Sequence, residues 1–105
     1  MYSNVGLVKE VLRVDVTDTN SDAELTNCIL SADALIDDIL TRYDLSVPSA
    51  VPLAVVNAGK YFAAWFFRMR GVPPAEVKAF WEVGMTFLNG YLAAQEEQAV
   101  FVRQA

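Results

Sequence analysis

The sequence contains no histidine and a single cysteine, Cys28. Zinc and most transition-metal sites use imidazole and thiolate ligands, so this shortage argues against such a site. A Ser or Cys nucleophile normally relies on a histidine base, which the chain does not supply. One cysteine cannot form an internal disulfide, and Cys28 falls in an apolar helical pattern where burial is expected. We therefore expect a protein that is not an enzyme, with no metal site and no cofactor.

Positive charge is also scarce, because 8 Lys and Arg stand against 13 Asp and Glu and give a net charge of −5. Phosphate contacts require a surplus of Lys and Arg, so no sequence-specific nucleic-acid binding is expected. The most apolar stretch, residues 50–67, carries Lys60 near its middle. A central lysine costs about 2.5 to 3.5 kcal/mol in a bilayer, so no membrane span is predicted. Polar residues after Met1 predict no signal peptide.

One polar segment imitates a calcium site without completing it. Residues 18–22 resemble the opening of an EF-hand loop, but Ala23 occupies the position of its turn glycine and Ile29 that of its bidentate glutamate. A polar turn that caps the following helix accounts for the same residues. We assign no calcium site.

Apolar residues are abundant, at 54% of the chain against 20% charged residues. In four segments they recur at helical spacing rather than alternating as in a strand, which predicts an all-α fold. The expected elements are a small bundle of three main helices and a short N-terminal helix, over residues 21–43, 52–70, 75–98 and 4–13. Residues 1–98 are expected to form one domain, and residues 99–105 an extended, flexible tail.

The expected boundaries depend on capping and turn residues. Ser3 is the predicted N-cap of the first helix. Ser21 and Glu24 form an S-x-x-E capping box for the second, and Pro52 suits the first turn of the third. Gly84 lies in the middle of the apolar arc of the last helix, where a missing side chain lets another backbone come close. We expect two helices to cross at Gly84.

The second and third predicted helices carry opposite charges. Residues on one arc of the second helix predict its core face: Leu25, Cys28, Ile29, Ala32, Leu35, Ile36, Ile39 and Tyr43. Asp22, Asp33, Asp37 and Asp44 form an acidic stripe beside that arc. The third helix is apolar nearly all round, which predicts a central position. Its charges are all positive: Lys60, Arg68 and Arg70.

Aromatic residues are concentrated in the last two predicted helices. Such a series is most often core, although it is also compatible with a ligand pocket between helices. A bundle this small cannot bury both sides of the third helix internally. The apolar excess therefore indicates an interface with another subunit.

The order of these features along the chain is similar to that in a known protein family. A short helix ends in Leu12-Arg13-Val14-Asp15, a polar turn follows, and Asp22-Ala23-Glu24-Leu25 leads into an apolar stripe. Tyr43, a proline-bearing loop and a helix that ends in Arg-Met-Arg come next. This pattern, over residues 4–70, resembles the head-tail connector (adaptor) family of tailed phages and prophages.

The resemblance implies a structural protein without catalysis. It implies a homo-oligomer, in a dodecamer-like ring, that lies between the portal and the tail-completion proteins. Such a subunit would be made in the host cytoplasm and end at the head-tail junction of the virion. The alternative is a small helical ligand-binding or regulatory interaction module.

A closed ring joins one patch of a subunit to a different patch of the next, so complementary charges on separate elements are expected. The predicted stripe of acidic residues on the second helix would meet the basic edge of the third, with the C-terminal apolar segment as an assembly arm. Alternatively, both charged faces are solvated or pair within one chain. The candidate interface residues are Asp33, Asp37, Asp44, Lys60, Phe67, Arg68, Arg70, Val100, Phe101 and Val102.

Overall fold

A computed structural model describes residues 1–69 and 75–104, and the side chains among them except those of residues 76 and 97–104. The described residues form four helices and no strand, which confirms the predicted all-α class. The helices are α1 (Val5–Leu12), α2 (Asp22–Thr41), α3 (Leu53–Arg68) and α4 (Ala75–Gln104).

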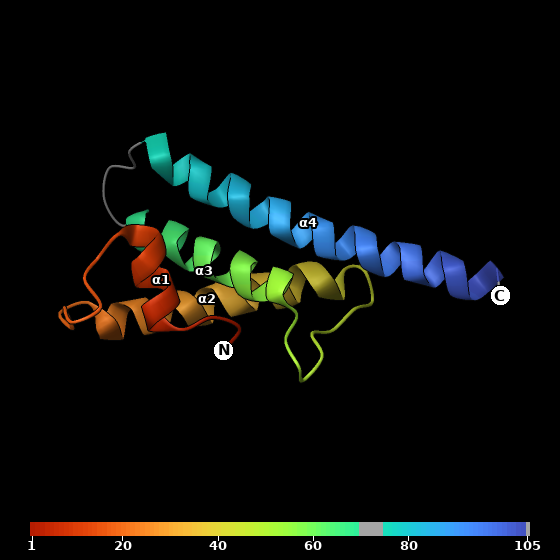
Figure 1. Cartoon of the computed structure of the whole chain (residues 1–105), viewed down its shortest axis with the longest axis horizontal. Helices are drawn as coiled ribbons and strands as arrows, with labels where there is room; N and C mark the ends of the chain where they lie inside the picture. The colour runs from red at the N-terminus through yellow and green to blue at the C-terminus, as the bar shows by residue number, and fades with distance from the viewer. Residues whose placement is uncertain (70–74, 105) are drawn as a thin grey trace.

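The central helix is α3, as its apolar circumference predicts. It runs antiparallel to both α2 and α4 and packs between them, while the short α1 lies across α2 and α3 (Figure 1). The molecule is elongated, with extents of 53 × 28 × 19 Å. Its length is due to α4, which continues past the other helices (Figure 1).

The core is aliphatic between α2 and α3 and aromatic between α3 and α4. Phe62 of α3 is fully buried, and its ring centroid lies 5.2 Å from that of Trp81. Tyr61 contacts Phe87 in a stacked arrangement with centroids 6.1 Å apart. The other large side chains that are fully buried are Leu25, Ile29, Ile36, Leu40, Leu88, Val8 and Val55.

Gly84 lies where α4 packs against α3, but the group that comes close is the Phe62 side chain and not a backbone. A Cβ built on Gly84 would lie 2.8 Å from Cε1 and 2.9 Å from Cδ1 of Phe62. No side chain larger than hydrogen fits there while the Phe62 ring keeps its place. The glycine therefore sets how closely α4 approaches α3.

Two of the predicted caps form differently. Asn4, not Ser3, is the N-cap of α1, and its Oδ1 accepts a hydrogen bond from the backbone N–H of Leu7 at 2.9 Å. Ser3 is buried instead, and its hydroxyl has no hydrogen-bond partner among the described residues. Ser21 is the N-cap of α2 as predicted, but its side chain makes no capping hydrogen bond. The Ser21 half of the predicted capping box therefore does not form.

Two helix ends also differ from the prediction. Because α2 ends at Thr41, Tyr43 leaves the core arc and is 61% exposed, while Leu40 is fully buried in its place. At the other end of the chain, α4 continues to Gln104, later than the predicted end at Gln98. No Pro or Gly interrupts this stretch, and the β-propensity of its residues is a weak, context-dependent preference.

Candidate interaction surfaces

The acidic stripe on α2 is engaged by the N-terminal residues. The backbone N–H of Tyr2 donates to Asp33 Oδ1 at 3.1 Å, and the Tyr2 hydroxyl donates to Asp37 Oδ1. The amino nitrogen of Met1 lies 3.8 Å from Asp33 Oδ2. These contacts lie within one chain, but their partners are the N-terminal residues and not the basic residues of α3. Asp33 and Asp37 therefore already have partners within the chain, which leaves them less free to contact a second copy.

Burial and the neighbouring carboxylates shift the protonation of this cluster. Desolvation, and then the hydrogen bond to Asp37, raises the pKa of Tyr2 from 10.0 to about 12. Desolvation also raises the pKa of Asp33, against the opposing effect of the hydrogen bond from Tyr2. The neutral phenol is thus the form that the folded chain favours.

The hydroxyl of Tyr2 is expected to stabilise the fold in a pH-dependent way. Its pKa is raised on folding, so its contribution is complete below pH 10 and is lost as the pH rises toward 12. We expect Tyr2→Phe to lower the free energy of unfolding by about 0.5 kcal/mol at neutral pH. The difference between the two proteins should close at high pH in denaturant titrations. Tyr43→Phe, at an exposed tyrosine, is the control, and a Tyr2→Phe difference that persists at pH 12 would contradict the assignment.

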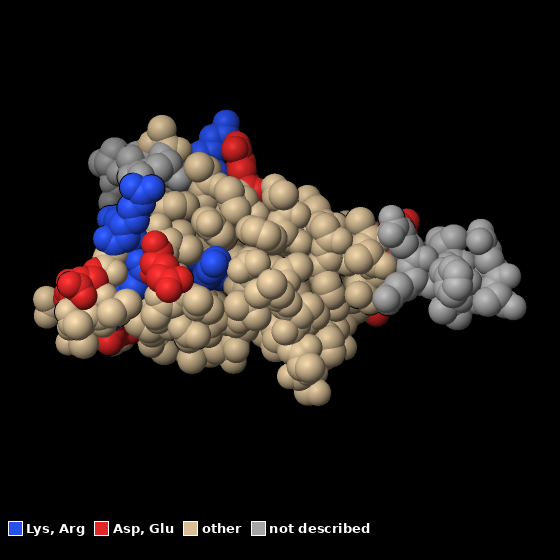
Figure 2. Space-filling view, viewed as in Figure 1, with Lys and Arg blue, Asp and Glu red and all other residues tan. Residues whose placement is uncertain are grey.

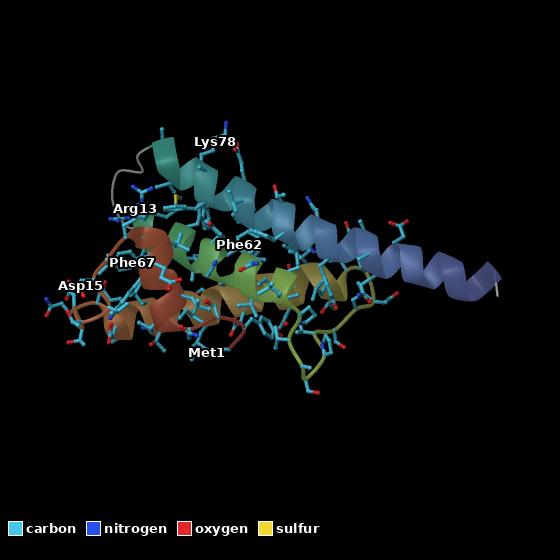
Figure 3. The ribbon with its side chains drawn as sticks, viewed as in Figure 1. Met1, Arg13, Asp15, Phe62, Phe67 and Lys78 are labelled. Atoms are coloured by element: carbon cyan, nitrogen blue, oxygen red, sulfur yellow. The ribbon has the colours of Figure 1, made fainter. Side chains whose placement is uncertain are left out.

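The remaining predicted interface residues do not form one patch. Asp44 follows α2, is exposed and has a left-handed backbone with φ 57°. On α3, Lys60 Nζ lies 5.7 Å from the ring centroid of Tyr61, and Arg68 Cζ lies 6.0 Å from that of Phe67. Phe67 is half-buried and packs against the core, and its place on the molecule is labelled in Figure 3. Thus the acidic and basic candidates lie on different helices, as predicted, but Phe67 belongs largely to the core.

Several predicted residues fall outside what the structure describes. Arg70 lies in the undescribed segment 70–74. The backbone of Val100, Phe101 and Val102 belongs to α4, but their side chains lie outside the described residues. Their role as an assembly arm stays a prediction.

A cleft of about 460 Å³ opens between α1, α3 and α4. Its walls combine the aromatic side chains of Tyr61 and Phe80 with the charged side chains of Glu10, Arg13 and Arg68. The two ring centroids lie 6.4 Å apart, so the aromatic wall is continuous. Charged side chains gather at this end of the molecule in the space-filling view (Figure 2). Among the residues that the structure describes, neither arginine forms an ion pair.

Arg13 has an unusual backbone. It follows α1 with φ 59° and ψ 40°, and its N–H donates to the carbonyl of Glu10 at 3.2 Å. The N–H of Val14 donates to Lys9 O at 2.9 Å, which completes a Schellman-type helix end. Glycine is the usual residue at this left-handed position, where other residues cost about 1 to 2 kcal/mol. An arginine here is a candidate functional residue.

Sequence reasoning selected Arg68 but missed Arg13, Tyr61 and Phe80 as one site. No motif links these residues, because the cleft arises where three helices meet. Within the described part of the chain, no cluster of three His, Cys, Asp or Glu side chains is placed to hold a metal ion. None of the described helices has the length and apolar character to cross a membrane.

No protein-family model, curated protein or solved structure matches this chain. The functional interpretation therefore depends on the chain's own residues and geometry.

Proposed function

We propose that this chain is a structural subunit of a homo-oligomeric assembly, of the head-tail connector type found in tailed phages. In this role it forms a ring through contacts between copies and joins the portal to tail-completion proteins. The subunit is made in the host cytoplasm and ends at the head-tail junction. It acts through its surfaces and not through catalysis.

The observation that carries this proposal is the length of α4. With 30 residues against 16 in α3, α4 is about 45 Å long and α3 about 24 Å. Counted outward from the Phe62–Gly84 contact in antiparallel register, Leu53 at the start of α3 lies level with Ala93. The rest of α4 passes beyond α3 (Figure 1). An isolated helix end of this length is marginal in water and gains stability from packing against a partner.

Exposed apolar side chains give further support. Several large apolar residues remain at the surface, among them Leu53 at 73% and Leu30 at 51% exposure. They come from different elements. In an assembly such side chains are removed from water when they pack against neighbouring subunits.

The cleft between α1, α3 and α4 favours the second candidate, a small helical ligand-binding module. Its volume of about 460 Å³ lies within the range of small-molecule sites. A binding module of this kind remains monomeric, whereas a connector subunit associates with itself. Solution mass therefore separates the two functions.

We expect the purified chain to self-associate. Light scattering coupled to size exclusion, from micromolar to millimolar protein, should give a mass that rises to a multiple of the 11.6 kDa chain. Electron microscopy of the largest species should show closed rings. A chain that stays at monomer mass throughout this range would contradict the connector function and favour the ligand-binding module.

A further inference from the structure

We propose that the end of α4 of one copy, from Glu96 onward, docks in the cleft between α1, α3 and α4 of a second copy. The cleft is the acceptor and the α4 end is the donor. This contact rests on the proposed assembly function and specifies its interface. The connector resemblance does not supply it, because it comes from the charges and apolar groups at the two ends of this molecule.

The side chains that line the acceptor cleft suit a partner that has both an anionic and an apolar group. Arg13 and Arg68 line the same cleft, and no described carboxylate forms an ion pair with either. Guanidinium groups bind carboxylates in bidentate geometry. The rings of Tyr61 and Phe80 offer an apolar wall beside these charges. Glu10 on the same cleft disfavours a partner whose charge is purely negative.

The left-handed backbone of Arg13 is an independent sign that the acceptor is used. A glycine at φ 59° would relieve strain without loss of any described contact of the helix end. With arginine at this position the fold is therefore less stable than it would be with glycine. A role of the guanidinium in binding an anionic partner explains why arginine is present.

The donor has the matching chemistry. Glu96 is exposed on the part of α4 that passes beyond α3. In sequence, Glu97 and Phe101 follow on the same helix, four residues apart, so they share a face of α4. The sequence of this segment thus supplies an acidic and an aromatic residue, the types that suit the arginines and rings of the cleft. Arg103 in the same segment complements Glu10 in sign.

The two partners lie at opposite ends of one molecule. The cleft includes Phe80 near the start of α4, and Glu96 lies about 24 Å further along the same helix. A rigid helix cannot fold back over that distance to fill its own cleft. The contact must therefore join different copies, and it is heterologous, so repetition closes a ring or extends a fibre.

Charge reversal on either side tests the contact in the full-length chain. We expect Arg13→Glu with Arg68→Glu, and separately Glu97→Arg with Phe101→Ser, each to weaken self-association at least about tenfold by light scattering. Lys78, on the outer side of α4 (Figure 3), and Glu82, four residues further along, are both exposed. The variants Lys78→Glu and Glu82→Arg reverse one charge each and serve as controls with unchanged mass. Circular dichroism establishes that every variant remains helical.

Mixing the two assembly-deficient variants provides the decisive test. One has an intact donor and the other an intact acceptor, so together they should form a 1:1 dimer that grows no further. A mixture that stays monomeric, or loss of assembly from the cleft variant alone, would overturn the proposed contact. If wild-type protein assembles and all variants keep its mass, the contact is wrong and the assembly function stands. A wild-type protein that never associates overturns both.

The variant Arg13→Gly distinguishes a role of Arg13 in binding from a role in the stability of the fold. It removes one guanidinium and relieves the left-handed backbone, so it should raise the midpoint of denaturant unfolding while weakening self-association. A merely structural arginine would leave assembly unchanged. If both Arg13→Gly and Arg68→Ala self-associate as strongly as the wild-type protein, the cleft is not the acceptor.

Discussion

Replacing Gly84 with leucine is expected to lower the free energy of unfolding by about 3 kcal/mol. The first added carbon already meets the Phe62 ring at 2.8 Å. Phe62 has no free space to retreat into, because it is fully buried and packs against Trp81. The cost of overpacking exceeds the helix propensity gained, which is about 1 kcal/mol. Denaturant unfolding at one fixed protein concentration measures the change.

Gly90 offers a matched control on the same helix. A Cβ added there meets nothing within 4 Å and the residue is exposed, so Gly90→Leu should leave stability unchanged or raise it by up to about 1 kcal/mol. Phe62→Ala alone should cost about 3 to 5 kcal/mol. Combined with Gly84→Leu, it should cost less than the sum by about 1 to 2 kcal/mol, because the leucine fills the vacated space. Strict additivity would mean that Gly84 and Phe62 do not share one site.

Removing the carboxylate of Asp22 is expected to lower the free energy of unfolding by about 2 to 3 kcal/mol. Asp22 Oδ1 lies 2.7 Å from Lys9 Nζ, and Lys9 is only 3% exposed. In Asp22→Ala the buried ammonium keeps one partner, the carbonyl of Val16 at 3.3 Å. The variant also loses a negative charge in the first turn of α2. The partial exposure of Asp22 keeps the effect below that of a fully buried pair.

Replacing Lys9, the other member of the pair, should lower the free energy of unfolding by less. Lys9→Met keeps the apolar stem in place, and the Asp22 side chain that loses its partner is 40% exposed although its Oδ1 is buried. The expected cost is therefore about 1 kcal/mol. The pair Arg42–Asp38 is the control, because it has the same 2.7 Å separation but exposed side chains. Asp38→Ala should cost about 0.5 kcal/mol or less. Equal costs for Asp22→Ala and Asp38→Ala would show that burial of Lys9 has no energetic consequence.

Helix content and most helix starts were predictable from the sequence, because they depend on short-range chemistry. The spacing of Leu25, Ile29 and Ile36 places them on one arc whatever lies opposite, and all three are fully or almost fully buried. The apolar circumference of α3 required a central position, and Gly84 marked the close approach of α4. Errors occurred at helix ends, where Tyr43 was assigned to the core and Gln98 to the end of α4. Helix ends have few local contacts to fix them, so propensity alone determines them poorly.

The candidate surfaces could be predicted from the sequence only in part. Helical periodicity alone places an acidic stripe on α2 and the basic residues Lys60 and Arg68 on α3. The packed fold was needed to show that Tyr2 engages Asp33 and Asp37, that Lys9 is buried, and that Arg13 and Arg68 line one cleft. Tyr2 and Asp37 are 35 positions apart in the chain, so no local pattern relates them. Residues so far apart meet only through the way that the four helices pack, and that packing depends on the shapes of buried side chains such as Phe62 against Gly84.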